Sequence, residues 1–171
     1  MGTGSIGAAV ASQAKNNGMV VTGLSRSGES NNSFARVYTT ADMAEFLVPL
    51  DYLVSVLPDT PATDGLLNAE TLALLPAHAC FINVGRANVV DDDALIAALR
   101  NGTLGGAVLD VFDEEPVPRD SPLWDAPNLV MTPHIAAISH PELIAPIFLD
   151  NYRRFVAGRS LKNLVSFELG Y

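Results

Sequence analysis

The feature that most constrains the fold is a glycine pattern at residues 2–7, which read GTGSIG and follow G-x-G-x-x-G. This pattern forms a tight turn between a buried strand and a helix. A stretch typical of a helix follows from Ala8 to Asn17, and Gly18 ends it. Only Met1 stands where the buried strand is expected. The sequence therefore predicts a phosphate-binding loop that lacks the strand normally leading into it.

Composition excludes several classes of protein. The chain has 171 residues and a formal net charge of −9, which argues against a nucleic-acid partner because such binding needs a clustered basic face. No apolar run approaches the roughly 18–20 residues that span a bilayer, and no signal-peptide pattern is visible. The single cysteine, Cys80, excludes an internal disulfide and a cysteine-rich metal site. We expect a cytoplasmic protein with no membrane partner.

Short apolar runs alternate with helical patterns along the chain. Strands are expected at residues 19–24, 52–57, 80–84, 106–111 and 129–131, and helices at 40–47, 69–75, 91–100 and 141–157. The strands are apolar throughout, as in sheets that helices cover on both faces. This order predicts the α/β class, with a doubly wound parallel sheet of Rossmann type. The last helix and the tail are expected to leave the sheet domain and pack elsewhere.

The glycine loop predicts a dinucleotide site. Gly2 allows the tight turn, Gly4 lets the backbone approach a pyrophosphate, and Gly7 permits close helix packing. The N-terminus of the following helix presents unpaired N–H groups to the phosphates, and Ser5 and Ile6 of the loop are expected cofactor contacts. An ordinary glycine-rich turn is the alternative, but the following helix and a strand ending at Leu24 favour the cofactor loop.

The end of that strand indicates which dinucleotide fits. NAD-binding domains usually place Asp or Glu there for the ribose hydroxyls. This chain has Ser25, Arg26 and Ser27 instead, with no acid until Glu29. Arg26 and the two hydroxyls could bind a 2′-phosphate, which a carboxylate would repel. We expect NADP(H) rather than NAD(H), with NAD(H) still possible; the alternative is that Arg26 is only a solvated loop residue.

Three further segments each follow an expected strand, at residues 81–86 (FINVGR), 109–116 (LDVFDEEP) and 132–137 (TPHIAA). Ligands bind at the carboxyl ends of strands in open α/β sheets. Reduction of a 2-oxo acid needs a hydride from nicotinamide, a group that binds the substrate carboxylate and a proton for the carbonyl oxygen. Arg86 can hold the carboxylate, His134 can donate the proton, and a neighbouring carboxylate would fix the His134 tautomer.

These segments together resemble the D-isomer-specific 2-hydroxyacid dehydrogenase family over the whole chain. Residues 25–27 (SRS), 55–58 (SVLP) and 167–171 (FELGY) look most like its glyoxylate/hydroxypyruvate reductase branch. The resemblance implies an NADPH-dependent oxidoreductase, acting as a homodimer on a small 2-oxo acid. Arg86 would bind the substrate, and Glu115 would be the partner of His134, with Glu114 as the rival assignment.

The resemblance also assigns cofactor contacts. Asp110 would meet the nicotinamide carboxamide, and Thr63 would reach a phosphate. The remaining contacts to ring, ribose and phosphates would come from the glycine loop and residues 25–27, and from Leu57, Pro58, Val84, Gly85, Arg86, His134 and Ala136. No metal is implied, since Asp91, Asp92 and Asp93 read as an acidic helix start. At position 87 this chain has Ala where the family usually has Gly, which is a small departure from the family's pattern.

A larger departure concerns the N-terminal side. The family builds its substrate domain mainly from roughly the first hundred residues, which are absent here. We expect residues 1–139 to form the dinucleotide-binding domain and 140–171 to belong to the substrate domain. The missing first strand would lie at the centre of the sheet, between the strands ending at Leu24 and Leu57. We therefore expect a piece of a longer protein, or a gap filled by a neighbouring segment.

The alternative function is a non-catalytic nucleotide-binding or cofactor-sensing module.

Overall fold

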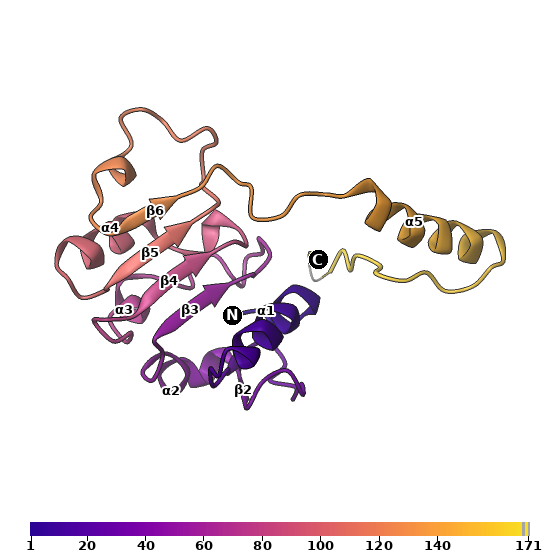
Figure 1. The fold of residues 1–171 in the computed structure, drawn as a ribbon, viewed down its shortest axis with the longest axis horizontal. Helices are drawn as coiled ribbons and strands as arrows, with labels where there is room; N and C mark the ends of the chain where they lie inside the picture. Colours follow the sequence, from indigo (N-terminus) through magenta and orange to yellow (C-terminus); the bar gives the residue numbers. More distant parts are fainter. Residues whose placement is uncertain (169, 171) are drawn as a thin grey trace.

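The computed structural model describes residues 1–168 and residue 170. Strands and helices of the first 131 residues form one body, and a long C-terminal helix stands apart from it (Figure 1). The element order is that of a parallel α/β domain, as the sequence predicted. The carboxyl ends of its strands carry the polar segments of interest.

The strands form two parallel sheets rather than one. The larger sheet has the order β3 (Tyr52–Ser55), β4 (Cys80–Asn83), β5 (Gly106–Leu109), β6 (Leu129–Met131). The smaller sheet pairs β1 (Gly23–Leu24) with β2 (Val37–Tyr38).

Met1 and Gly2 lie in the gap between the two sheets. The Met1 ammonium donates to the carbonyl of Val54, and the Met1 carbonyl accepts from the Val56 N–H at 3.1 Å. On the other side the Gly2 N–H donates to the Leu24 carbonyl at 2.9 Å. The gap lies between β1 and β3, where the sequence predicted that a strand is missing.

The helices of the body are α1 (Ser5–Asn16), α2 (Met43–Leu47), α3 (Ala69–Leu72) and α4 (Asp92–Arg100). Their starts follow from capping side chains. Asn68 accepts from the N–H groups of Glu70 and Thr71, and Asp91 accepts from the Ala94 N–H at 3.0 Å. Single turns of 3-10 helix occupy Thr40–Asp42, Ala87–Val89 and Pro122–Asp125.

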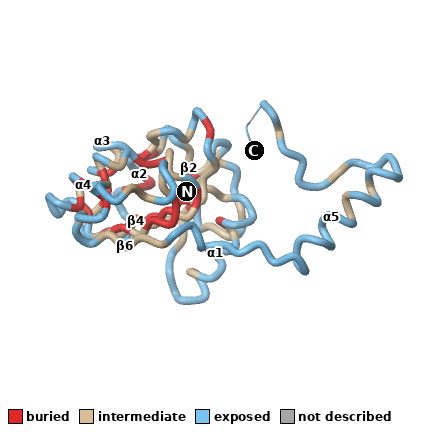
Figure 2. The backbone as a smooth tube through the Cα atoms, turned by 90° about the horizontal axis from the view of Figure 1, so that it is seen from above, coloured by how far each residue is buried: buried red, intermediate tan, exposed pale blue. Residues whose placement is uncertain are grey.

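The two faces of the larger sheet are covered unequally. Figure 2 shows α2, α3 and α4 on one side of the strands and α1 on the other. On the side of α2–α4, the paired row Leu53, Phe81 and Ala107 is buried. On the opposite face, the row that runs from Val54 across β4 and β5 is only half-buried, and it ends at Val130, which is 57% exposed. Helices thus lie on both faces of the sheet, as the sequence predicted, but α1 is the helix of the body on the side of this half-buried row.

Several element boundaries also differ from the sequence expectation. The strand expected at 19–24 shortens to Gly23–Leu24, and Val20 is 87% exposed beside the gap, where no neighbouring strand holds it. β2 was not expected, because two residues carry no recognisable periodicity. Strands expected to reach residues 57, 84 and 111 end at 55, 83 and 109, where the chain turns into the loops of the site. The first helix begins at Ser5 rather than Ala8, since Gly4 is its N-cap, and Thr39 is the N-cap of the 3-10 turn that opens the 40–47 segment.

The C-terminal helix α5 (Pro141–Val156) buries none of its residues. The chain beyond it runs back toward the body (Figure 1), and Asn151 and the Lys162 backbone exchange two hydrogen bonds of 2.9 and 3.0 Å. The division into domains at residues 139 and 140 stays a prediction. Within the described residues, no helix is both long enough and apolar enough to cross a membrane.

Candidate active site

The glycine loop has the geometry that a dinucleotide requires. Gly2 has φ of 86°, in the left-handed region that favours glycine. A Cβ at Gly7 would stand 2.0 Å from the Gly2 carbonyl oxygen, so only glycine fits there. A Cβ at Gly4 would meet nothing within 4 Å, which leaves open space beside the backbone.

The start of α1 supplies donors to that open space. The Ala8 N–H makes an intrahelical bond to the Gly4 carbonyl at 2.8 Å. The N–H groups of Ser5, Ile6 and Gly7 therefore have no acceptor within the helix, and the helix dipole adds partial positive charge there. These features fit the pyrophosphate of a dinucleotide.

The loop after β1 is held in a turn by hydrogen bonds to its own serine hydroxyl groups. Ser25 Oγ accepts from the Gly28 N–H at 3.1 Å, and Ser27 Oγ accepts from the Glu29 N–H at 3.3 Å. The turn presents Arg26 to a pocket of about 320 Å³. Leu57, Pro58, Thr63 and Glu168 also line it, so the structure brings together four residues that the sequence assigned to the cofactor.

The Thr63 hydroxyl makes hydrogen bonds within its own loop. Its hydroxyl donates to the Pro58 carbonyl at 2.7 Å and accepts from the Thr60 N–H at 3.0 Å. These bonds close the 58–63 loop and occupy the hydroxyl. The contact of Thr63 with a phosphate stays a prediction.

The end of β4 is fixed by Asn83, whose side chain is completely buried. Its amide nitrogen donates to the Arg86 carbonyl at 2.9 Å, and its oxygen accepts from the Gly85 N–H at 3.1 Å. Gly85 lies so close to β3 that a Cβ would stand 2.7 Å from the Leu57 carbonyl oxygen. This turn leaves Arg86 exposed, with Nη1 donating to the Gly85 carbonyl at 2.8 Å.

Asp110, at the end of β5, holds the loop that follows β6. Its buried carboxylate accepts from the Thr132 hydroxyl at 2.5 Å and from the N–H groups of Ile135 and Ala136 at 2.9 Å each. Burial acts to raise the pKa of Asp110, but the hydrogen bonds outweigh it, so the pKa lies below its ordinary value. Three bonds occupy most of the sites of a carboxylate that accepts about four. Asp110 thus positions the 132–136 loop, and its contact with nicotinamide stays a prediction.

His134 sits in this loop with φ of 53°, a conformation that histidine enters more readily than most residues. Its Nδ1 lies 2.8 Å from Oε2 of Glu115, so the structure pairs Glu115, not the rival Glu114, with the histidine. The other oxygen of Glu115 accepts from the Phe112 N–H at 3.0 Å. The bond to His134 and then that to Phe112 lower the pKa of Glu115. The side chains of His134 and Glu115 are 50% and 37% exposed, which leaves the histidine accessible to a ligand.

Arg86, Glu115 and His134 thus follow neighbouring strands β4, β5 and β6 at one edge of the sheet, as the sequence predicted. Val84 and Gly85 lie in the same turn as Arg86. Sequence reasoning gave Asn83 no role and Asp110 only a cofactor contact. A polar residue at the end of an apolar strand was the available signal, since such a side chain must find partners when it is buried.

A parallel α/β domain with this glycine loop defines the class of dinucleotide-binding domains. The family described as "D-isomer specific 2-hydroxyacid dehydrogenase, NAD binding domain" matches residues 1–136. The chain belongs to this family.

Relatives agree along the whole chain. Glyoxylate/hydroxypyruvate reductase A of Klebsiella pneumoniae strain 342 is 36% identical over 171 residues, covering all of this chain and 55% of that protein. A D-isomer specific 2-hydroxyacid dehydrogenase from Xanthobacter autotrophicus Py2, solved with NADPH and MES, is 44% identical with a TM-score of 0.94, over 99% of this chain and 70% of that one. An NADPH-dependent glyoxylate/hydroxypyruvate reductase from Sinorhizobium meliloti, solved with NADP and sulfate, is 36% identical with a TM-score of 0.92, over all of this chain and 55% of that one. The chain spans about half the length of the curated relatives it matches.

Proposed function

We propose that this chain is the NADP(H)-binding part of a reductase that converts a small 2-oxo acid, such as glyoxylate or hydroxypyruvate, into the 2-hydroxy acid. The observation that carries the proposal is the Glu115–His134 pair, 2.8 Å apart, on the loops that follow β5 and β6, with Arg86 on the loop that follows the neighbouring β4. The relatives named above support the substrate class. The homodimer and the cytoplasmic location expected from the sequence stay predictions.

Each of the three side chains has a separate role in the proposed reaction. Arg86 holds the substrate carboxylate in a planar two-bonded geometry. Because Glu115 engages Nδ1 of His134, the proton for the carbonyl oxygen comes from the other ring nitrogen, Nε2. The hydrogen bonds from His134 and Phe112 lower the pKa of Glu115, so Glu115 stays ionised and orients the His134 ring through Nδ1. The bound nicotinamide supplies the hydride.

We further propose a preference for NADP(H). Arg26 and the hydroxyls of Ser25 and Ser27 end β1 without an acidic residue, and Arg26 lines the pocket beside Leu57 and Pro58. Two of the similar structures hold NADPH or NADP. A guanidinium can bind a 2′-phosphate through charge-assisted bonds.

The experiment follows NADPH consumption with glyoxylate and with hydroxypyruvate. His134→Ala and Glu115→Gln should lower kcat by about 10²–10⁴-fold, the usual contribution of acid–base groups. Glu114→Gln is the matched control and should keep wild-type kcat. Turnover of His134→Ala near that of the wild type would contradict the mechanism, and NADPH binding without turnover on any 2-oxo acid would support the non-catalytic module instead.

A further inference from the structure

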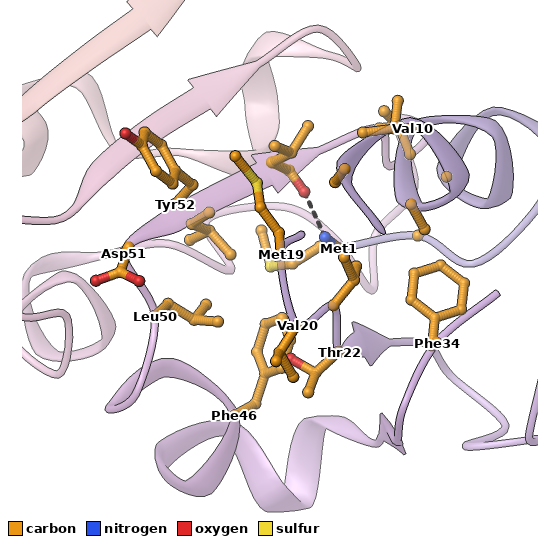
Figure 3. Close-up of a pocket in the computed structure, with 18 of the residues that line it drawn as sticks. Met1, Val10, Met19, Val20, Thr22, Phe34, Phe46, Leu50, Asp51 and Tyr52 are labelled. Atoms are coloured by element: carbon orange, nitrogen blue, oxygen red, sulfur yellow. Dashed lines mark hydrogen bonds between the residues drawn. The ribbon is translucent and has the colours of Figure 1, made fainter. Parts of the chain in front are cut away.

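Two pockets of the protein differ in the charges that line them. The larger is a cavity of about 540 Å³ in the gap between β1 and β3, and its lining, which includes Met1, is mostly apolar (Figure 3). The smaller is the pocket of about 320 Å³ beside Arg26, and its lining contains two opposite charges, those of Arg26 and Glu168. The smaller pocket is therefore the one suited to distinguish ligands by their charge.

Glu168 reaches this pocket from the chain that follows α5. This segment runs back to the body (Figure 1), and Asn151 fixes its course by exchanging hydrogen bonds with the Lys162 backbone. The Gly170 N–H then donates to the Ser166 carbonyl at 2.8 Å, and Gly170 has φ of 80°, in the region that favours glycine. Glu168 thus lies between the two residues of a hydrogen-bonded turn.

This turn packs against the loop that follows β3. A Cβ at Gly170 would stand 3.4 Å from the methyl carbon of Thr60, which is van der Waals contact. The Thr60 N–H donates to the Thr63 hydroxyl at 3.0 Å, so the loop is fixed from within. The turn therefore has a firm support, and Glu168 lines the same space as Arg26.

The two charged side chains suit different forms of the cofactor. A guanidinium binds the 2′-phosphate of NADP(H) through charge-assisted hydrogen bonds. A carboxylate repels that phosphate, but it can accept hydrogen bonds from the ribose hydroxyls of NAD(H), the usual role of an Asp or Glu in such domains. In this chain β1 ends without an acidic residue, and Glu168 brings a carboxylate to the pocket from a distant part of the sequence.

We propose that Glu168 is a second cofactor-selecting residue, which acts against Arg26 and lets the pocket accept NAD(H) as well as NADP(H). Its carboxylate accepts from the ribose 2′-hydroxyl of NAD(H) and lowers the affinity for a 2′-phosphate. The proposal rests on the proposed function, because it requires the adenosine end of the cofactor to lie beside Arg26. A purely structural role of Glu168 would affect both cofactors alike, so the ratio of their affinities is the decisive quantity.

The test measures the dissociation constants of NADPH and NADH by fluorescence titration, for the chain and for Glu168→Gln. The variant removes the charge and nearly keeps the size of the side chain. The NADH constant divided by the NADPH constant should rise about threefold to fivefold, the upper range for one exposed charge. Added salt should reduce this rise, since screening acts over about 8 Å at physiological ionic strength. Glu142→Gln, which removes the same charge from an exposed position of α5 outside the pocket, is the matched control and should leave the ratio unchanged.

Arg26→Ala separates this proposal from the proposed function. If Arg26→Ala lowers the ratio and Glu168→Gln leaves it unchanged, the pocket binds the 2′-phosphate and only the role of Glu168 is wrong. If neither variant changes the ratio, the adenosine end does not lie in this pocket, and the proposed NADP(H) preference fails together with this inference. Equal weakening of NADPH and NADH in Glu168→Gln would show that the turn only supports the loop after β3, which also overturns the proposal.

Discussion

The two sheets differ in how extensively their strands are paired. In the larger sheet, continuous ladders join β3 to β6, and the buried polar side chains Asn83 and Asp110 bond to the loops of the site. In the smaller sheet only two residue pairs join β1 to β2, and the buried Met1 ammonium lies in the gap beside it. Among the described residues, buried hydroxyls without a hydrogen-bond partner occur on both sides, at Thr22 just before β1 and at Ser55 in β3.

This difference separates two tasks. The side chains proposed for catalysis extend from the well-paired sheet, whose loops are fixed by buried polar contacts. The residues proposed to select the cofactor follow β1, in the poorly paired sheet. Because only two residue pairs join β1 to β2, few backbone hydrogen bonds hold the smaller sheet together, and it should be the less stable part of the body. The following changes test this comparison.

The largest expected effect is a pH dependence from Met1. The pKa of its ammonium is about 5 in the folded chain against an ordinary 8.0, so between these values the unfolded chain binds the extra proton. Stability therefore rises with pH across this window and is lost as pH falls toward 5, by roughly 4 kcal/mol at 1.36 kcal/mol per unit. Urea unfolding at a series of pH values measures it.

Acetylation of the Met1 nitrogen is the control, because it removes the titrating group. The ionisable side chains that line the same cavity, Asp51 and Tyr52, remain in place. The acetylated chain should lose the slope across this window. An equal slope in both forms would mean that other groups cause it.

The variant Asp110→Ala tests the larger, well-paired sheet. It leaves the Thr132 hydroxyl and the Ile135 and Ala136 N–H groups without their acceptor, and it should lower the free energy of unfolding by roughly 3 kcal/mol. Because the pKa of Asp110 lies below 3.8, this contribution is present above pH 3.8 and lost only as pH falls through the lower folded value.

Asp113→Ala is the matched control for this variant, since Asp113 is exposed in the same segment and should change stability by less than about 0.5 kcal/mol. Denaturant unfolding compares the two. Equal effects would show that Asp110 does not hold the 132–136 loop.

A pair of glycine variants separates folding from cofactor binding in the loop. Gly7→Ala forces a Cβ against the Gly2 carbonyl and should cost about 2 kcal/mol of stability. Gly4→Ala meets no atom within 4 Å and should cost less than about 1 kcal/mol, yet it should weaken NADPH binding about tenfold by entering the phosphate space. Thermal unfolding and fluorescence titration measure the two effects, and unchanged NADPH affinity in Gly4→Ala would count against a phosphate at that position.

The smallest effect is on cofactor choice. Arg26→Ala should reduce the preference for NADPH over NADH about tenfold, or roughly 1.4 kcal/mol, with little change in stability. Titration of both cofactors measures the ratio. An unchanged ratio would leave Arg26 as a loop residue without a role in selectivity.

Much of the fold could be predicted because its strands are apolar runs and its helices carry recognisable starts. Strands β3 to β6 lie within the ranges expected from the sequence. β2 was not predicted because it is only two residues long. The length of the strand in the 19–24 segment was overestimated, because an apolar composition does not by itself provide a neighbouring strand for pairing.

The candidate site was predictable in its charged residues and less so in their support. Arg86 and His134 follow strand ends, where position indicates a ligand, and the choice of Glu115 over Glu114 came from the resemblance to the family. The roles of Asn83 and Asp110 depend on loops that fold back onto them, and such contacts leave no periodic pattern in the sequence.

The central claim is that the glycine loop and the strand ends bind one NADP(H) molecule together. Backbone amide chemical shifts, followed while NADPH is added, test it most directly. The account predicts that the amides of Ser5 and Ile6 shift together with those of Gly85 and Ala136, and that NADPH saturates at lower concentration than NADH. Absence of shifts at both places, or shifts confined to α5 and the tail, would contradict it.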